Sequence, residues 1–376
     1  MDKLGFGFMR LPVKNEDNSN IDFEILNQMV DKYIENGGNY FDTGFGYHNG
    51  NSEIAIRECV INRYPREKVL IADKLPLYCL KPEHNLENIF NTQLKRCGVD
   101  YFDYYMVHNT TDYFDEVSKK LDCFGFIQKK KEEGKVKYIG LSHHDTAESL
   151  ERLLNENPNV DFVQLQINYL DWDNEGIQAR KCYEVARAYG KEVIVMEPLK
   201  GGTLVNIPEE AKKAFKNYNP DLSISSWGIR YCASLEGVSM VLTGMSNLEQ
   251  MEDNISYMKE FKKLNRDELK IIEDVKEIIA DSIAIPCTYC NYCIEHCPNN
   301  IPIPKFFALY NDAKQAIDIQ VLYYIYYNNF AQKGGKASDC DYCGECNEHC
   351  TQHLDIPDYL EDVKELLEVD LDEYLS

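Results

Sequence analysis

Val69-Leu70-Ile71-Ala72-Asp73-Lys74 is an apolar run that ends in two charged residues, and it decides the fold. A helical pattern follows over 85–97, and a second apolar run, Phe102–Val107, then ends at His108. Parallel strands that are buried on both faces have such nearly continuous apolar runs, and helices connect them. This strand–helix–strand order therefore predicts a parallel sheet.

The same alternation extends over about 250 residues, a length typical of a (β/α)8 TIM barrel. Five more strand candidates are Asn39–Asp42, Tyr138–Leu141, Phe162–Ile167, Val193–Met196 and Met240–Leu242. An open doubly wound sheet is the alternative, but no G-x-G-x-x-G segment follows an early strand, which disfavours its dinucleotide-binding form. We predict an α/β TIM barrel, although the eighth strand is not visible and segment 221–231, where it could lie, has a helical pattern.

Eight cysteines near the C-terminus form two copies of the spacing C-x2-C-x2-C-x3-C. The first copy is Cys287, Cys290, Cys293 and Cys297, and the second is Cys340, Cys343, Cys346 and Cys350. This is the bacterial ferredoxin spacing for 4Fe-4S clusters, whereas a zinc site usually pairs C-x2-C with a distant second pair. We therefore predict two 4Fe-4S clusters and electron transfer in this region. The second copy has Thr351 where the first has Pro298.

Length and charge limit the classes of function. The chain has 376 residues and a formal net charge of -23, which argues against binding to nucleic acid or to an anionic membrane. No apolar run approaches the ~20 residues that span a bilayer, and free thiols indicate a reducing cytoplasm. The predicted division is a barrel over 1–265, a helical linker over 266–284, and a small, mainly helical ferredoxin-like domain over 285–376.

Four ionisable residues lie at or just after the ends of successive strand candidates: Asp42, Tyr47, Lys74 and His108. In a parallel barrel these ends meet on one face, where functional side chains collect. An ammonium lowers the pKa of a neighbouring phenol, a carboxylate keeps that ammonium charged, and an imidazole can donate to a developing alkoxide. Each residue alone would more often be a core or surface group, so only the joint placement indicates catalysis.

The segment Phe41-Asp42-Thr43-Gly44-Phe45-Gly46-Tyr47 resembles the signature of the aldo-keto reductases. Further blocks follow in the family's order: Asp73-Lys74-Leu75-Pro76, Met106-Val107-His108, Ile139-Gly140-Leu141-Ser142, Val163-Gln164, Glu197-Pro198-Leu199 and Thr243-Gly244-Met245-Ser246-Asn247. The cysteine-rich tail resembles the ferredoxin-like extension of one subgroup. The resemblance implies a barrel that binds NAD(P)H and acts on a small-molecule carbonyl or alcohol substrate.

The resemblance also implies roles for single residues. Tyr47 would be the proton donor, Lys74 would depress its pKa, Asp42 would pair with Lys74, and His108 would orient the carbonyl oxygen. The expected cofactor contacts are Ser142 and Gln164 at the nicotinamide, Gly244 and Ser246 at the adenosine phosphate, Gln250, Asp253 and Asn254 near the adenine, and Pro198, Leu199, His143 and Met196 beside them. His143 and Met196 depart from the family, which usually has Asn and Tyr there. Segment 245–254 has no Lys or Arg, so we expect no strong preference for NADP.

Three functions fit this sequence. The leading one is an oxidoreductase with NAD(P)H-linked carbonyl chemistry in the barrel and electron transfer through the clusters to a ferredoxin-like redox partner. The two parts of this function do not connect directly, because nicotinamide transfers a hydride whereas a cluster transfers single electrons. A flavin normally connects such carriers, and no flavin motif is visible. The alternatives are an iron–sulfur electron-transfer protein with a vestigial barrel, and an ordinary reductase whose clusters are structural.

Overall fold

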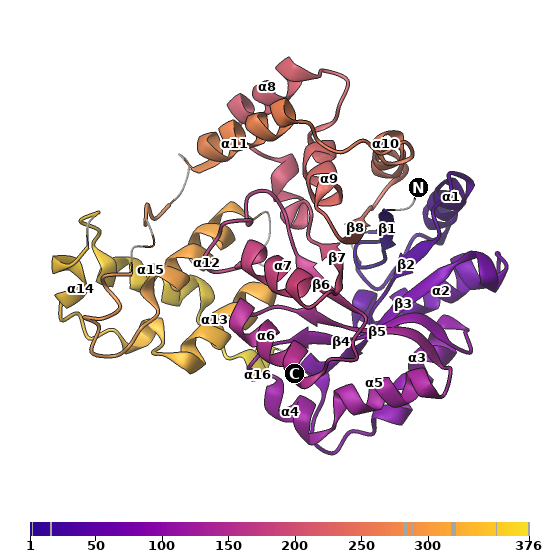
Figure 1. Cartoon of the computed structure of the whole chain (residues 1–376), viewed down its shortest axis with the longest axis horizontal. Helices are drawn as coiled ribbons and strands as arrows, with labels where there is room; N and C mark the ends of the chain where they lie inside the picture. Colours follow the sequence, from indigo (N-terminus) through magenta and orange to yellow (C-terminus); the bar gives the residue numbers. More distant parts are fainter. Residues whose placement is uncertain are drawn as a thin grey trace.

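The structure is a computed structural model that describes residues 1, 3–15, 17–280, 284–287, 289, 291–316, 321–350 and 352–374. Eight parallel strands close into one barrel in sequence order, with the last strand paired to the first (Figure 1). The predicted TIM barrel is therefore confirmed. The strands are β1 (Leu4–Gly7), β2 (Tyr40–Asp42), β3 (Leu70–Pro76), β4 (Phe102–Thr110), β5 (Val136–His143), β6 (Phe162–Gln166), β7 (Glu192–Met196) and β8 (Val238–Gly244).

The strand that sequence analysis did not find is β1, at the very start of the chain. It pairs with both β2 and β8 and is fully buried. A Cβ atom added to Gly5 would lie 2.7 Å from the Leu242 side chain, so the crowded barrel interior requires a glycine there. Two glycines in four residues leave too short an apolar run to stand out. Segment 221–231 belongs to a helix, as its pattern indicated.

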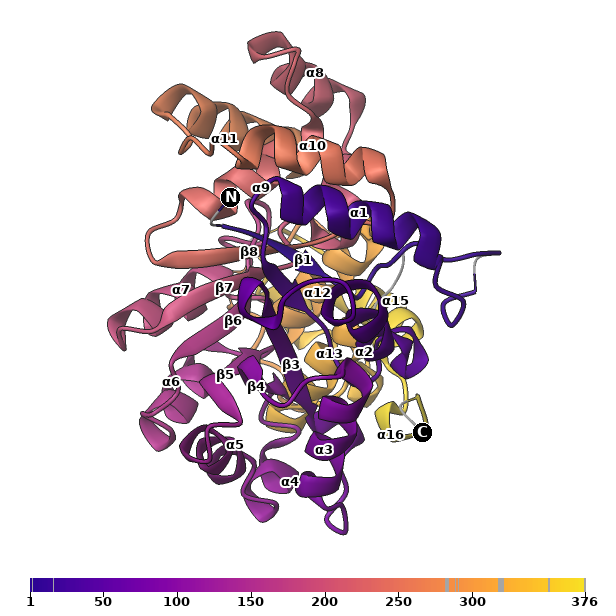
Figure 2. The same ribbon diagram turned by 90° about the vertical axis from the view of Figure 1, so that its right-hand side faces the viewer.

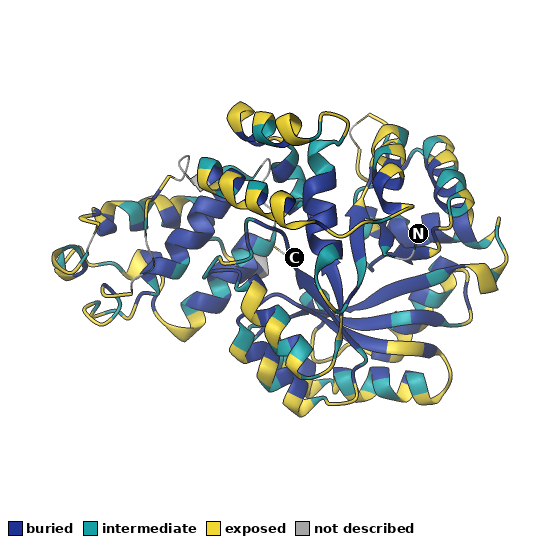
Figure 3. Cartoon of the chain, turned by 45° about the horizontal axis from the view of Figure 1, so that its top comes forward, coloured by how far each residue is buried: buried dark blue, intermediate teal, exposed yellow. Residues whose placement is uncertain are grey.

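Helices cover the outside of the barrel (Figure 2). They are α1 (Phe23–Glu35), α2 (Asn51–Ile56), α3 (Leu86–Cys97), α4 (Asp115–Lys120), α5 (Cys123–Glu132), α6 (Ala147–Glu156), α7 (Ala179–Ala188), α8 (Glu209–Tyr218), α9 (Ile224–Ser234), α10 (Leu248–Met258) and α11 (Arg266–Ala280). Most outer helices present one buried face and one exposed face, whereas α2 and α9 have no exposed residue (Figure 3). Helix α11, in the predicted linker, buries Ile272, Val275 and Ile279 in the barrel's own core.

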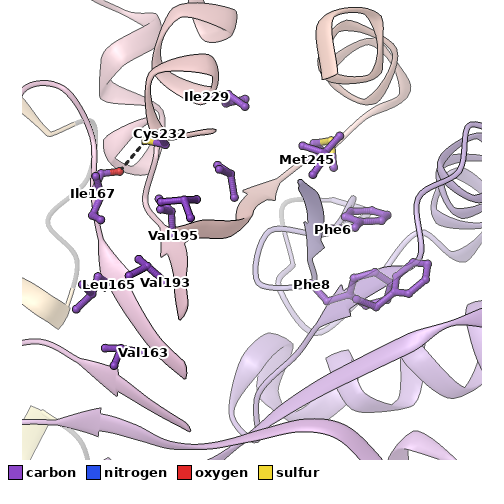
Figure 4. Packing of buried hydrophobic residues seen from close by; sticks show 14 of the residues in the cluster. Phe6, Phe8, Val163, Leu165, Ile167, Val193, Val195, Ile229, Cys232 and Met245 are labelled. Carbon is purple, nitrogen blue, oxygen red and sulfur yellow. Dashed lines mark hydrogen bonds between the residues drawn. The ribbon is translucent and has the colours of Figure 1, made fainter. Parts of the chain in front are cut away.

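The barrel has two hydrophobic layers. Tyr40, Met106 and Phe162 fill the interior of the barrel together with residues of β3, β7 and β8. A larger layer joins the outer strand faces to the helices, and Figure 4 shows part of it, where the Cys232 thiol of α9 donates to the Ile167 carbonyl at 3.2 Å. These layers make the strand ends a rigid platform for side chains.

The C-terminal region is helical and has its own core. Its helices are α12 (Ile303–Gln315), α13 (Val321–Lys333), α14 (Glu345–Glu348), α15 (Ile356–Leu367) and α16 (Leu371–Tyr374). Helices α12 and α15 each follow a cysteine motif and each begin with Ile-Pro, which suits a first turn because proline lacks the N–H that stays unbonded there. The repeated pair His296 and His349 stacks with ring centroids 3.4 Å apart. The sequence repeat is therefore also a structural repeat.

Helices α12 and α13 lie against the barrel (Figure 1). Asp312 of α12 and Asp171, in the loop after β6, both contact the buried Lys200 Nζ, at 2.5 and 2.6 Å. Lys333 of α13 reaches Asp112 at 2.6 Å.

In the described residues, no helix has the length and apolar character needed to cross a membrane.

Candidate active site and cluster-binding region

Four predicted catalytic residues meet at the carboxyl ends of neighbouring strands. Asp42 ends β2, Lys74 lies in β3, and His108 lies in β4, where it is paired with Pro76. The Lys74 Nζ atom is 2.5 Å from Asp42 Oδ1 and lies 4.8 Å from the centre of the Tyr47 ring. The parallel register of three strands thus brings together residues from separate parts of the chain, as predicted.

The charge of Lys74 is maintained inside the protein. Its side chain is fully buried, and its Nζ also donates to the Thr43 carbonyl at 2.5 Å. Burial alone would lower the pKa of Lys74, but the nearby Asp42 and Tyr47 outweigh burial and leave the pKa above its ordinary value. Burial raises the pKa of Asp42, and Lys74 opposes that rise. A persistent ammonium therefore lies beside the Tyr47 phenol.

Tyr47 and His108 face each other near this ammonium, with ring centroids 6.0 Å apart. Burial raises the pKa of Tyr47 while Lys74 lowers it, so the expected effect of Lys74 is present but burial is larger. Burial, with Lys74 and His144 adding to it, lowers the pKa of His108 well below its ordinary value. His108 is therefore neutral at pH 7. Its buried Nδ1 has no hydrogen-bond partner among the described residues.

Of the residues predicted near the nicotinamide, three lie together and His143 lies apart from them. The Met196 sulfur accepts from Gln164 Nε2 at 3.5 Å and from Ser142 Oγ at 3.9 Å, so these three side chains lie together. His143 does not join them, because its Nε2 lies 2.9 Å from the Thr146 carbonyl oxygen. His144, which we did not predict, lies beside Ser142 instead, with Nε2 2.9 Å from Ser142 Oγ.

A cavity of about 940 Å³ opens at the same end of the barrel, between the ends of β7 and β8 and the start of α10. It is large enough for an extended cofactor. Seven of the predicted cofactor contacts line it: Pro198, Leu199, Gly244, Ser246, Gln250, Asp253 and Asn254. Asn247 caps α10 by accepting from the Gln250 N–H at 2.9 Å, and the amides of this helix start suit an anionic group.

The charges around this cavity are mostly acidic. Arg10 is the one basic side chain among its lining residues, and its neighbours include Glu197, Glu249, Glu252 and Asp253. Two lysines outside segment 245–254, Lys200 and Lys259, have other partners. Lys200 is paired with two aspartates, as described above, and Lys259 donates to Asn36 at 3.0 Å. Sequence analysis missed Arg10 because it missed β1, which Arg10 follows by three residues.

The cysteines of the two motifs interleave. One hollow is lined by Cys297 of the first motif and by Cys340, Cys343 and Cys346 of the second, and the other is lined by Cys287, Cys293 and Cys350. Cys290 is outside the described residues. The fourth cysteine of each motif thus lies with described cysteines from the first three of the other motif, as in two-cluster ferredoxins.

The chemistry of these thiols fits iron–sulfur clusters. Burial, together with the neighbouring Cys340, Cys297 and Cys343, raises the pKa of Cys346 to about 11, so the thiolates need positive metal ions to balance them. The Cys297 and Cys350 sulfurs accept N–H groups at 3.4 Å from Ile301 and Leu354, which are bonds to the sulfurs of the kind that tune a cluster. No three His, Cys, Asp or Glu side chains in the described part of the chain form a site for a single metal ion.

Comparison with protein families divides the chain in the same way. The aldo/keto reductase family model matches residues 3–277, and a 4Fe-4S dicluster domain model matches residues 286–354.

Two curated relatives match the barrel. An uncharacterized oxidoreductase, YqkF, of Bacillus subtilis is 25% identical over 270 residues, which are 65% of this chain and 85% of that protein. The NADH-specific methylglyoxal reductase of Escherichia coli is 25% identical over 224 residues, which are 54% of this chain and 65% of the relative.

Solved structures agree with the fold. The holo form of the aldo-keto reductase AKR11C1 from Bacillus halodurans has a TM-score of 0.58 and 21% identity, covering 73% of this chain and 91% of that one. An aldo-keto reductase from Klebsiella pneumoniae, solved in complex with NADPH, has a TM-score of 0.58 and 16% identity, covering 73% and 90%. The chain belongs to the aldo/keto reductase family, and it is an oxidoreductase of that type with a C-terminal 4Fe-4S dicluster domain.

Proposed function

We propose that the barrel catalyses NAD(P)H-dependent reduction of a small-molecule carbonyl compound, or the reverse oxidation of an alcohol. The observation that carries this proposal is the buried contact of Lys74 with Asp42 and Tyr47, next to a neutral His108. These groups supply a proton donor, a fixed positive charge beside it, and a neutral hydrogen-bonding group at one point. The nicotinamide cofactor would supply a hydride to the carbonyl carbon.

Each residue has a defined task in this proposal. Tyr47 gives its hydroxyl proton to the carbonyl oxygen, and Lys74 stabilises the phenolate that remains. Asp42 keeps Lys74 charged and in place. His108 orients the carbonyl oxygen through a hydrogen bond, which its neutral state permits.

The expected cofactor contacts divide into two groups. Ser142, Gln164 and Met196 would hold the nicotinamide end, and the cavity beside α10 would hold the adenosine end. A dinucleotide extended across the carboxyl ends of the strands would connect them. His143 is not part of this proposal, because its ring is bonded to the Thr146 carbonyl.

We further propose that the C-terminal region, 285–376, holds two 4Fe-4S clusters that exchange single electrons with a ferredoxin-like redox protein. Residues 1–265 would form the catalytic barrel and 266–284 the linker between the two domains. Six further cysteines, Cys59, Cys79, Cys97, Cys123, Cys182 and Cys232, are free thiols, which suits a reducing compartment such as the cytoplasm.

Nucleotide binding tests the proposed function. NADH fluorescence should report micromolar binding to the parent protein. Ser246→Trp would fill the cavity and should weaken binding at least tenfold. Ser256→Trp is the matched control, because Ser256 is also an exposed serine but lies within α10 and does not line the cavity. Absence of binding to the parent, or equal binding by both variants, would contradict the proposal.

A further inference from the structure

The loop that follows β5 connects the barrel's active site to the C-terminal domain. It runs from His143 to Thr146, where α6 begins. Its inner side reaches Ser142 through the His144 imidazole, and its outer side contacts α13. Asn329 Nδ2 of α13 donates to the His144 carbonyl oxygen at 3.3 Å. His144 and Asn329 are 185 residues apart in the chain. The loop after β5 therefore contacts both the active site and the C-terminal domain.

The inner contact fixes the position of the Ser142 hydroxyl. Burial, with His143 and Lys74 adding to it, lowers the pKa of His144 to about 3, so the ring is neutral. The Ser142 hydroxyl lies 2.9 Å from His144 Nε2, and it donates to the Met196 sulfur at 3.9 Å. A neutral imidazole forms a hydrogen bond with a hydroxyl through Nε2 in either tautomer. The His144 ring therefore fixes where the Ser142 oxygen lies.

The outer contacts hold the loop in place. Asp145 is completely buried and accepts N–H groups from Thr146 at 2.7 Å and Asp112 at 2.8 Å. Lys333 of α13 lies 3.4 Å from Asp145 and 2.6 Å from Asp112, and so it supplies the opposite charge. A buried carboxylate requires such a partner. Asn329 is also completely buried, so its contact with the loop lies in well-packed surroundings, whereas the Lys333 side chain is 40% exposed.

We propose that His144 is a positioning residue of the barrel's active site, and that Asn329 and Lys333 of the C-terminal domain hold it there. The C-terminal domain then sets the orientation of Ser142, independently of any electron transfer through the clusters. This proposal rests on the proposed function, in which Ser142 contacts the nicotinamide. The proposal explains why two polar residues of α13 pack against this part of the barrel. The Asn329 amide contacts the loop after β5, and the Lys333 ammonium contacts the carboxylates of Asp112 and Asp145.

Variants of His144 test the inner contact. His144→Leu should lower kcat for carbonyl reduction at least tenfold, with the dissociation constant for NADH unchanged within twofold, because most of the cofactor's contacts lie in the cavity at the adenosine end. His144→Gln keeps a hydrogen-bonding group for Ser142 and should recover much of kcat. If the parent neither binds NADH nor reduces carbonyls, the proposed function fails. If the parent is active and His144→Leu keeps kcat within twofold, this inference fails.

Variants of α13 test the outer contact. Asn329→Ala removes the bond to the loop, whereas Asn328→Ala is a matched control because the Asn328 amide donates to Tyr324 within the same helix. With iron content equal to the parent's, Asn329→Ala should lower kcat at least threefold and speed amide hydrogen exchange in peptide 142–149. Asn328→Ala should change neither. Equal exchange in all three proteins would overturn the proposal, and this comparison decides it even if His144→Leu does not fold.

Discussion

Asp42→Asn removes one charge of the buried pair and leaves the shape of the side chain unchanged. The Lys74 ammonium then keeps the Thr43 carbonyl and the Tyr47 ring nearby, and a neutral amide oxygen replaces the carboxylate. Removing one partner of a buried ion pair destabilises a protein by about 3–5 kcal/mol. This is a large share of the 5–15 kcal/mol that stabilises a typical domain.

The lysine can relieve this loss by giving up its proton. Neutralising Lys74 at pH 7, from an ordinary pKa of about 10.4, requires roughly 5 kcal/mol, at 1.36 kcal/mol for each pH unit. That value is therefore an upper limit on the loss at pH 7.

The pH dependence has a definite sign. In the parent, the pKa of Lys74 is raised, so its stabilising effect persists until the pH exceeds that pKa. In the variant, the pKa in the folded state is lowered, so the unfolded state binds more protons and stability rises with pH. The deficit should shrink by roughly 1.4 kcal/mol per pH unit between pH 7 and 9 where folded Lys74 is neutral.

Chemical denaturation followed by tryptophan fluorescence measures this effect. Both tryptophans, Trp172 and Trp227, lie in the barrel part of the chain, so the signal reports barrel unfolding. Adding Lys74→Met to Asp42→Asn should abolish the pH-dependent part of the deficit. A loss below 1 kcal/mol at pH 7, or an equal loss at pH 7 and 9, would refute this account of the pair.

Three further predictions follow from the site and the cluster region. Because burial keeps His108 neutral, kcat/KM should be flat from pH 6 to 8, and an inflection near pH 6.5 that disappears in His108→Gln would contradict this. The dissociation constants of NADH and NADPH should differ by less than tenfold, because Arg10 is the one basic residue lining the cavity; Arg10→Ala should weaken NADPH binding by about 1.5–3 kcal/mol if Arg10 contacts a phosphate. Cys297→Ser should mainly remove the cluster ligated by Cys346, which should lower the iron content and the EPR signal of the clusters by about half. Cys59→Ser changes a buried core thiol and should alter neither the iron content nor the EPR signal.

The sequence alone predicted most of the barrel, and it predicted that the four residues proposed for catalysis would lie close together. Apolar runs that end in Lys74 and His108 indicated strands, and the parallel register then brings their ends together. Strand β1 was missed because its two glycines interrupt the apolar pattern. Arg10 was missed with it.

The contacts of neighbouring residues were harder to predict. His143 and His144 are adjacent in the sequence, and only the direction of the chain after β5 determines which one reaches Ser142. The contact between Asn329 and His144 joins residues whose separation along the chain leaves no local pattern. The cysteine spacing predicted which residues would ligate metal, and that stays a prediction, whereas the division of the cysteines between two hollows depends on how the repeat folds.

The most direct test of the account is carbonyl reduction by Tyr47→Phe, measured with NADH in anaerobically purified protein. The change removes one hydroxyl, and the loss of a positioned proton donor should lower kcat by about 10²–10⁴. Tyr78→Phe is the control, because the Tyr78 ring also contacts His108, with centroids 5.6 Å apart, but has no proposed role in proton transfer. The account predicts a large loss for Tyr47→Phe, near-parental activity for Tyr78→Phe, and unchanged iron content in both. Activity of Tyr47→Phe within twofold of the parent would contradict it.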